Sequence, residues 1–352
     1  MNFIIFLIII SIGSVSSSGY TCPGPGAMKF NPPDDLNKPL YWPSIWNDSM
    51  PPIPFASQQL CTWEIEIPNG LYASVIFYKN APSDVSISVT YPDGSMEGLD
   101  NNDFYPYIFT SPKFSITLYK SKNGGAFSFK VSWSKYPEVK HDSIQLQKET
   151  KPTSMIPNGT TFIAETTVSL VGFGLKNQSH YPLLRQSAVF DGDSTNGKFI
   201  GTLYRIMMSK KEKVSSGKSL TVYTWGLEQQ FDYVLYMVQD RTNEQNFFSY
   251  RGENCDPNYD CSYVINAVYG VSVLVTSDDH SEFIKSIGSF PDGATLKIYE
   301  GSISDETLVT KLTKDNYKSR LPMELKNTIR QYVLDTGVIN GFTITKDSTN
   351  GN

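Results

Sequence analysis

The sequence has few of the side chains on which catalysis depends. It contains 3 histidines and 4 cysteines among 352 residues. The motifs of serine hydrolases, zinc proteases and phosphate-binding loops do not occur in it. His141 falls in a polar stretch, His180 follows a possible glycan acceptor, and we interpret the acidic run around His280 as an exposed loop. We therefore expect no catalytic residues, and a protein that is not an enzyme.

Charge of either sign is also scarce. Charged residues make up 18% of the chain, and the formal net charge is −5 without long runs of one sign. The densest basic segment, Lys210-Lys211-Glu212-Lys213, is interpreted as a solvated loop. Because a protein that binds nucleic acid usually carries a basic patch, no nucleic-acid partner is expected.

Long hydrophobic runs are missing beyond the first residues. Residues 3–10 are almost entirely Phe, Ile and Leu, and small residues follow over 11–19. An apolar run of this length is too short to cross a bilayer and is typical of a secretory signal. We predict a signal peptide at residues 1–18, no transmembrane segment, and a secreted, extracellular product. The polar C-terminus gives no lipid-anchor signal.

The cysteines are few but even in number, which suits an oxidising compartment. Three pairings are possible, and we favour Cys22–Cys61 and Cys255–Cys261 because each pair is close in the sequence. The first bond would close a loop of roughly 40 residues, which the chain-entropy model values at about 4 kcal/mol. A zinc site is disfavoured, because paired cysteine spacing and nearby histidines are missing.

Three Asn-x-Ser/Thr sequons are present, at Asn47, Asn158 and Asn177. In an exported chain each is a candidate for glycosylation on a surface loop.

What the chain has in abundance is short segments of alternating apolar and polar residues, separated by turn residues. Alternation is clear at residues 61–67, 85–89, 114–118 and 127–133, with Pro68-Asn69-Gly70 and Asn123-Gly124-Gly125 as turns. Since successive side chains of a strand point to opposite faces, this pattern predicts antiparallel β-sandwiches, an all-β fold. A short helix is expected only at residues 323–334, following Pro322.

Composition divides the chain into parts. Residues 137–158 are polar and are interpreted as a linker that covers a sheet edge, between domains at 20–136, 159–240 and 245–346. A weak repeat links the last two, because the segments ending in Asp191-Gly192 and Glu300-Gly301 both lead through a polar loop to an apolar strand. The glycine is expected at positive φ, with the acid accepting local backbone hydrogen bonds.

Taken together, the motifs of residues 20–136 resemble the CUB-like domain of secreted nematode proteins. They are Cys22-Pro23, Tyr41-Trp42-Pro43, Trp46-Asn47, Gln59-Leu60-Cys61-Thr62-Trp63-Glu64-Ile65, Ile67-Pro68-Asn69-Gly70-Leu71-Tyr72-Ala73, Pro106-Tyr107-Ile108-Phe109 and Phe127-Ser128-Phe129-Lys130-Val131-Ser132-Trp133. The later blocks look like diverged CUB units. The resemblance implies tandem jelly-roll-like sandwiches, extracellular recognition, and a link to innate immunity and the defence response.

Many CUB domains bind calcium through acids at loop ends, and the resemblance raises that question here. The candidate acids are Glu64, Glu66, Asp84, Asp93, Asp191 and Asp193. Acids in turns more often form the turn than hold a metal, so no metal ligand and no cofactor is assigned, with calcium kept as the alternative.

Aromatic residues in loops favour binding. The candidate ligand residues are Tyr41, Trp42, Trp46, Tyr105 and Tyr107, although such rings can also close the end of a sandwich. We expect a recognition protein that binds an extracellular glycan or protein. The alternative is a structural or surface-coat protein that assembles through its sandwiches.

Overall fold

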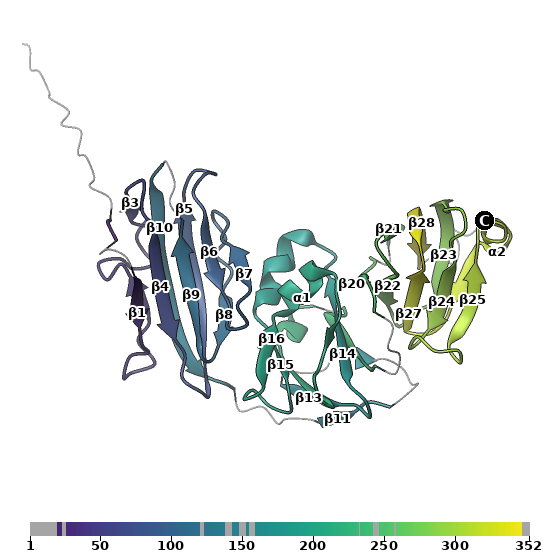
Figure 1. The fold of residues 1–352 in the computed structure, drawn as a ribbon, viewed down its shortest axis with the longest axis horizontal. Helices are drawn as coiled ribbons and strands as arrows, with labels where there is room; N and C mark the ends of the chain where they lie inside the picture. Colours follow the sequence, from purple (N-terminus) through teal and green to yellow (C-terminus); the bar gives the residue numbers. More distant parts are fainter. Residues whose placement is uncertain are drawn as a thin grey trace, which may run out of the picture.

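The chain folds into three successive groups of strands. The computed structural model describes residues 20–22, 26–119, 123–137, 143–147, 153–154, 159–231, 233–241, 246–256 and 258–346. We call the described residues 20–137, 143–241 and 246–346 the first, second and third blocks. They follow one another along the long axis of the molecule (Figure 1). The predicted signal peptide, His141 and Asn158 lie outside the described residues.

The first block is a sandwich of two sheets, as the alternating sequence predicts. One sheet has the order β1-β4-β9-β6-β7 and the other β2-β10-β5-β8, with β3 paired to β10. Its strands are β1 (Ala27–Phe30), β2 (Leu40–Trp42), β3 (Pro54–Phe55), β4 (Cys61–Glu66), β5 (Leu71–Asn80), β6 (Ile87–Thr90), β7 (Met96–Gly98), β8 (Tyr107–Thr110), β9 (Lys113–Leu118) and β10 (Gly125–Lys135). All pair antiparallel except β1 with β4. In β4, Trp63 and Ile65 are fully buried between half-exposed neighbours.

The second block has one sheet of its own, in the order β11-β13-β18-β15-β16. Its other strands, β12, β14, β17 and β19, belong to a sheet that it shares with the third block. Its strands are β11 (Ser143–Gln145), β12 (Thr153–Ser154), β13 (Thr160–Ile163), β14 (Val168–Gly174), β15 (Ala188–Asp191), β16 (Lys198–Gly201), β17 (Lys213–Val214), β18 (Ser219–Tyr223) and β19 (Tyr236–Asp240). The helices are η1 (Gln178–Arg185), α1 (Leu203–Ser209) and η2 (Leu227–Gln229). β11 and β12 come from the predicted linker and occupy sheet edges, beside β13 and β19.

The third block packs the sheet β21-β28-β23-β26 on the strands β20-β22-β27-β24-β25. Its elements are β20 (Ser249–Glu253), β21 (Cys261–Ala267), β22 (Ser272–Ser277), β23 (Glu282–Ser289), β24 (Leu296–Glu300), β25 (Leu308–Leu312), α2 (Tyr317–Arg320), β26 (Met323–Leu325), β27 (Ile329–Leu334) and β28 (Gly337–Thr345). The helix predicted at residues 323–334 is wrong. That segment forms β26 and β27, and the short helix α2 precedes Pro322.

The second and third blocks share a sheet. β14 pairs with β20 in parallel, through Phe173↔Gly252 and Gly174↔Glu253. One nine-stranded sheet therefore has the order β12-β19-β14-β20-β22-β27-β24-β25, with β17 paired to β14 beside it. A buried cluster that includes Phe173 and Tyr250 packs across this joint. Tyr250 donates to Gln331, and Gln239 donates to Tyr250 at 2.7 Å.

The weak sequence repeat corresponds to matching hairpins. β15 with β16 and β24 with β25 each pair antiparallel with one shift of register. Gly192 and Gly301 have φ of 136° and 119°, as predicted. The acids before them do accept backbone hydrogen bonds, Asp191 from Ser216 at 2.9 Å and Glu300 from Asn327 at 3.1 Å. The donors are distant in sequence rather than local, so each acid attaches a separate loop to its hairpin.

None of the helices in the described ranges is both long enough and apolar enough to span a membrane.

Candidate functional site

The first and second blocks meet around one buried arginine at the end of η1. The Arg185 side chain is 2% exposed and pairs with Glu97 at 2.6 Å and with Asp103. Its guanidinium carbon lies 4.1 Å from the ring centroid of Tyr107 and 4.6 Å from that of Tyr204. Two carboxylates and two ring faces therefore hold the same cation, which fixes the second block on the first.

Burial shapes the electrostatics of this contact. It raises the pKa of Glu97, and the opposing influence of Arg185 does not cancel the rise. Burial also opposes the charge of Arg185, but Glu97, Tyr107 and Asp103 outweigh it and raise the pKa of the arginine. Because an unpaired charge would be costly here, the ion pair and the contact between the blocks form together.

A second contact lies beside the first. Arg205, on α1, pairs with Asp93 at 3.2 Å and lies 4.6 Å from the ring centroid of Tyr91. The Tyr91 ring stacks on Phe199, with centroids 6.2 Å apart and planes 13° apart. Phe199 and Phe190 belong to the same buried cluster as the core of the first block. The core of the first block thus extends into the β15–β16 hairpin, while the rest of the second block has a core cluster of its own.

A cleft of about 390 Å³ opens at this junction, a volume within the range of small-ligand sites. Its apolar lining is Leu71, Pro92, Pro112, Tyr136, Phe190 and Phe199. Its polar lining includes Asn69, Asp93, Ser111, Thr195, Asn196 and Lys198. The lining of the cleft therefore combines apolar groups from both blocks with hydrogen-bonding groups.

The polar groups of the cleft differ in what they already bind. Asn69 accepts a hydrogen bond from Ser111 at 2.7 Å, and Asp93 is held by Arg205. Thr195, Asn196 and Lys198, on and after the β15–β16 turn, have no side-chain hydrogen bond or ion pair with any other described residue. These three groups remain available to a ligand, and their chemistry suits hydroxyl and amide groups.

The aromatic residues predicted to bind ligand do not form one site, and none of them lines the cleft. Trp42, Trp46 and Tyr107 are 7%, 2% and 0% exposed, so their rings belong to the protein interior. We correct their assignment, because a buried ring offers no face to a ligand. Tyr41 and Tyr105 are half-buried, and Tyr41 packs its ring edge on Trp46 at 5.8 Å.

The acids considered for calcium do not converge. Within the described ranges, no cluster of three or more His, Cys, Asp or Glu residues could hold a metal. Glu64 pairs with Lys113 at 2.8 Å, and Asp84 accepts from Asn123 at 3.0 Å. Since calcium needs several free oxygens around one point, the residues present do not fit it.

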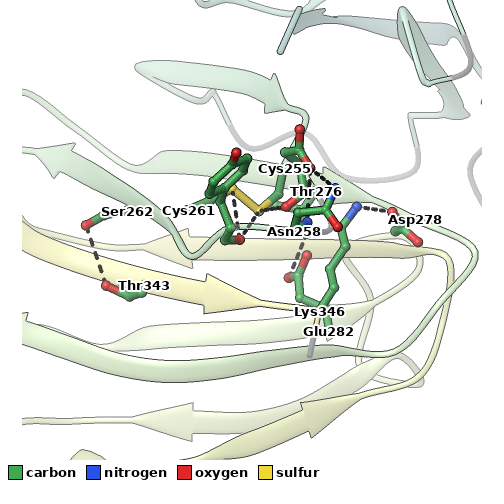
Figure 2. The surroundings of a disulfide bond; sticks show 11 residues. Cys255, Asn258, Cys261, Ser262, Thr276, Asp278, Glu282, Thr343 and Lys346 are labelled. Carbon is green, nitrogen blue, oxygen red and sulfur yellow. Dashed lines mark hydrogen bonds and ion pairs between the residues drawn. A yellow bond between two sulfur atoms is a disulfide. The ribbon is translucent and has the colours of Figure 1, made fainter. Parts of the chain in front are cut away.

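The third block contains its own group of buried and half-buried charges beside a disulfide (Figure 2). Figure 2 shows Lys346 reaching Asp278 near the Cys255–Cys261 bond. Glu282 accepts hydrogen bonds from Thr276 at 2.9 Å and from Tyr332, and burial raises its pKa.

His280 lies at the surface beside these charged groups. The His280 ring lies 3.0 Å from the Asp278 carboxylate, but the histidine side chain is 86% exposed. Lys346 forms an ion pair with the same carboxylate. The histidine ring therefore faces solvent, and Asp278 has both His280 and Lys346 as partners.

The cysteines are joined as favoured, Cys22 to Cys61 and Cys255 to Cys261. Asn47 and Asn177 are exposed, and each side-chain oxygen accepts a hydrogen bond from the backbone of the residue two positions later, at 3.0 Å in both cases. The structure thus places both sequons at the surface.

Arg185, Glu97 and Arg205 were missed from sequence, whereas Tyr107 and Asp93 were named there for other roles. Arg185 and Glu97 are 88 residues apart, and neither belongs to a recognisable motif. The only available indication was that Arg185 ends an apolar stretch containing Leu183 and Leu184, where a charge is unusual.

Comparison with protein families identifies the first block. Residues 17–137 match the family model described as the CUB-like domain. The first block is therefore similar to CUB-like domains over its whole length. CUB-like domains are generally non-catalytic binding modules, and with two disulfides in the chain this fits an extracellular protein that binds a partner. Residues 145–225 and 242–347 match two families described only as domains of unknown function.

No curated protein matches the chain. Among solved structures, the CUB1-EGF-CUB2 domains of rat MASP-1 are 9% identical, covering 91% of this chain and 99% of that one, with a TM-score of 0.24. The corresponding human MASP-1/3 structure is 9% identical, covering 87% and 97%, with a TM-score of 0.23. The extracellular region of zebrafish Gpr126/Adgrg6 is 10% identical, covering 92% and 53%, with a TM-score of 0.25. These scores are too low to relate the arrangement of the blocks to those proteins.

Proposed function

We propose that this is a secreted, non-enzymatic recognition protein that binds a glycan in the cleft between its CUB-like domain and the second block. The observation that carries the proposal is the cleft itself, with ring and proline surfaces on its floor and Asn196 and Lys198 unengaged at its rim. Sugars present apolar ring faces together with hydroxyl groups, which is the complementary pattern.

The rigid junction strengthens this proposal. The buried Arg185 ion pairs and the shared core hold the two walls of the cleft in fixed positions before a ligand arrives. A preformed site loses less conformational entropy on binding than one that must order itself.

The wider role is proposed from the CUB-like resemblance. We place the protein in the innate immune response to pathogens, with domains at 20–136, 159–240 and 245–346, the last two being diverged CUB units. The matching β15–β16 and β24–β25 hairpins support a common origin for these two.

The test is binding of the purified protein to a glycan panel and to intact bacterial surfaces, with and without a calcium chelator. Asn196→Ala with Lys198→Ala should reduce binding about tenfold or more, because two hydrogen bonds, one of them charged, are lost. Lys314→Ala, an exposed change in the third block, is the matched control. Full binding by the double variant would show that the glycan does not bind in the cleft. Loss of binding on chelation would contradict a metal-free site.

Absence of glycan binding would redirect the proposal to a protein partner or to a structural role. Light scattering separates these two. A coat protein should form multimers, whereas a recognition module that binds a soluble protein should not self-associate.

A further inference from the structure

Four large apolar side chains are exposed together at one end of the third block, and none of them lines the cleft. Phe248, Val264, Val268 and Tyr269 are 44%, 48%, 55% and 77% exposed. Val268 and Tyr269 form the tip of the turn between β21 and β22, and Phe248 packs on Tyr269 with ring centroids 5.5 Å apart. A group of apolar side chains exposed on and beside a turn indicates an interaction surface. We call these four residues the apolar tip.

The apolar tip is held in place by the backbone. Gly270 donates to Ala267 at 3.3 Å, closing the turn, and Val268 donates to the side chain of Asn266 at 3.0 Å. Phe248 donates to Val271 at 2.8 Å, which attaches its strand to the same turn. The exposed side chains therefore project from a fixed frame, so little ordering is required when they meet a surface.

Cations lie next to the apolar tip. Lys210 and Arg251 line a hollow of about 200 Å³ together with Phe248 and Val264. Lys210 is exposed and makes no ion pair with any described residue, while its carbonyl is fixed by a hydrogen bond from Tyr250 at 2.8 Å. Arg251 lies 3.6 Å from one carboxylate, that of Glu253.

Addition of a peptide strand at this place is disfavoured. β21 is an edge strand, but its register shifts between Tyr263 and Ile265, and Arg251 donates to the Val264 carbonyl at 2.8 Å. A bulge and an occupied carbonyl both protect an edge from pairing. The apolar side chains thus lie beside an edge that is already closed.

We propose that the apolar tip, with Lys210 and Arg251, docks on an anionic lipid bilayer. Aromatic rings are favourable at the headgroup level of a membrane, and nearby cations are attracted to acidic lipids. An exposed apolar turn held by backbone hydrogen bonds, beside positive side chains, matches that surface in both apolar character and charge. The proposal is independent of the glycan cleft, since the two places share no residue.

The test is co-sedimentation of the full chain with vesicles of phosphatidylcholine, alone or mixed with phosphatidylglycerol, at two salt concentrations. We expect binding to the mixed vesicles that weakens with salt. Val268→Ser with Tyr269→Ser should weaken it about tenfold or more by loss of apolar contact. Lys210→Glu should weaken it on the order of thirtyfold, because one charge is reversed. Ile45→Ser, at a site 75% exposed in the first block, is the matched control.

Tyr269→Trp gives a local readout in the same protein. The chain already has 5 tryptophans, so the signal is the difference in emission between the variant and the original protein. This difference should shift to the blue with phosphatidylglycerol vesicles, because the added ring leaves water. Three results would each overturn the proposal. They are no binding to mixed vesicles, an equal loss of vesicle binding in Ile45→Ser and in the tip variants, or no emission shift when the protein is bound. Tip-dependent capture of a synthetic peptide without vesicle binding would assign the surface to a protein partner instead.

Discussion

At the scale of single residues, the most consequential side chain is that of Arg185, which belongs to no recognisable sequence motif. Arg185 is buried, and its two carboxylate partners both come from the first block. An ion pair at low exposure differs from a surface pair, because removing one partner leaves the other charge without solvent. Its contribution is therefore to specify how two blocks meet.

Arg185→Met should lower the free energy of unfolding by about 3–5 kcal/mol, since Glu97 and Asp103 would remain buried without a cation. The measurement is urea denaturation followed by tryptophan fluorescence. Lys314→Met removes an exposed partner of Asp292, with side chains 54% and 85% exposed, and should change stability by about 0–1 kcal/mol. Similar values for both variants would show that the arginine does not organise the junction.

The pair Lys346–Asp278 should make the third block sensitive to acid. Burial alone would raise the pKa of Asp278, but hydrogen bonds from Lys346 and His280 hold it below its ordinary value. A carboxyl with a lowered pKa in the fold stabilises above its unfolded pKa of about 4, and that stability is lost as pH falls through the lower folded pKa.

Lys346→Met should therefore be less stable at neutral pH and should lose less stability on acidification below about pH 4. Urea midpoints measured across this range test the prediction. Lys285→Met is the control, because its pair with Asp260 is more exposed, at 34% and 40%. Parallel pH profiles for the original protein and Lys346→Met would contradict it.

At the scale of elements, strands were predictable from sequence where one of their two faces is exposed to solvent. β4 and β9 alternate in burial as their sequences alternate. β27 is buried along its whole length, so its sequence has no alternation, and the spacing of Leu325, Ile329 and Val333 fits a helical face equally well. The error at residues 323–334 follows from that ambiguity.

The candidate site was less predictable than the strands. A cleft between blocks depends on which distant residues meet, and local pattern carries no information on that. Aromatic loop residues such as Trp42 were misread, because ring content alone does not distinguish a binding face from a core.

The joint between β14 and β20 depends on a glycine. A Cβ on Gly252 would lie 2.2 Å from the Phe173 ring, far inside contact distance. Gly252→Ala should therefore cost about 1–3 kcal/mol through displacement of the buried ring. Gly98→Ala, where nothing lies within 4 Å, should be within about 0.5 kcal/mol of the original protein. Equal denaturation midpoints for the two variants would exclude a close-packed joint.

At the scale of the whole molecule, the three blocks should not unfold independently. The first two share a core cluster, and the last two share a sheet. We expect a single calorimetric transition for the full chain, because loss of any block exposes apolar surface of its neighbour. Gly252→Ala should separate an earlier transition of the third block, whereas Gly98→Ala should not. Three resolved transitions in the original protein would contradict this coupling.

The parallel pairing of β14 with β20 also has a mechanical consequence. If opposite forces pull the first and third blocks apart along the strand direction, β14 and β20 are drawn past each other. The hydrogen bonds at Phe173↔Gly252 and Gly174↔Glu253 are then loaded together in shear, instead of opening one after another. A protein anchored at one end and holding a ligand at the other would carry tension through this sheet. The chain segment that connects the two strands would then not bear that tension.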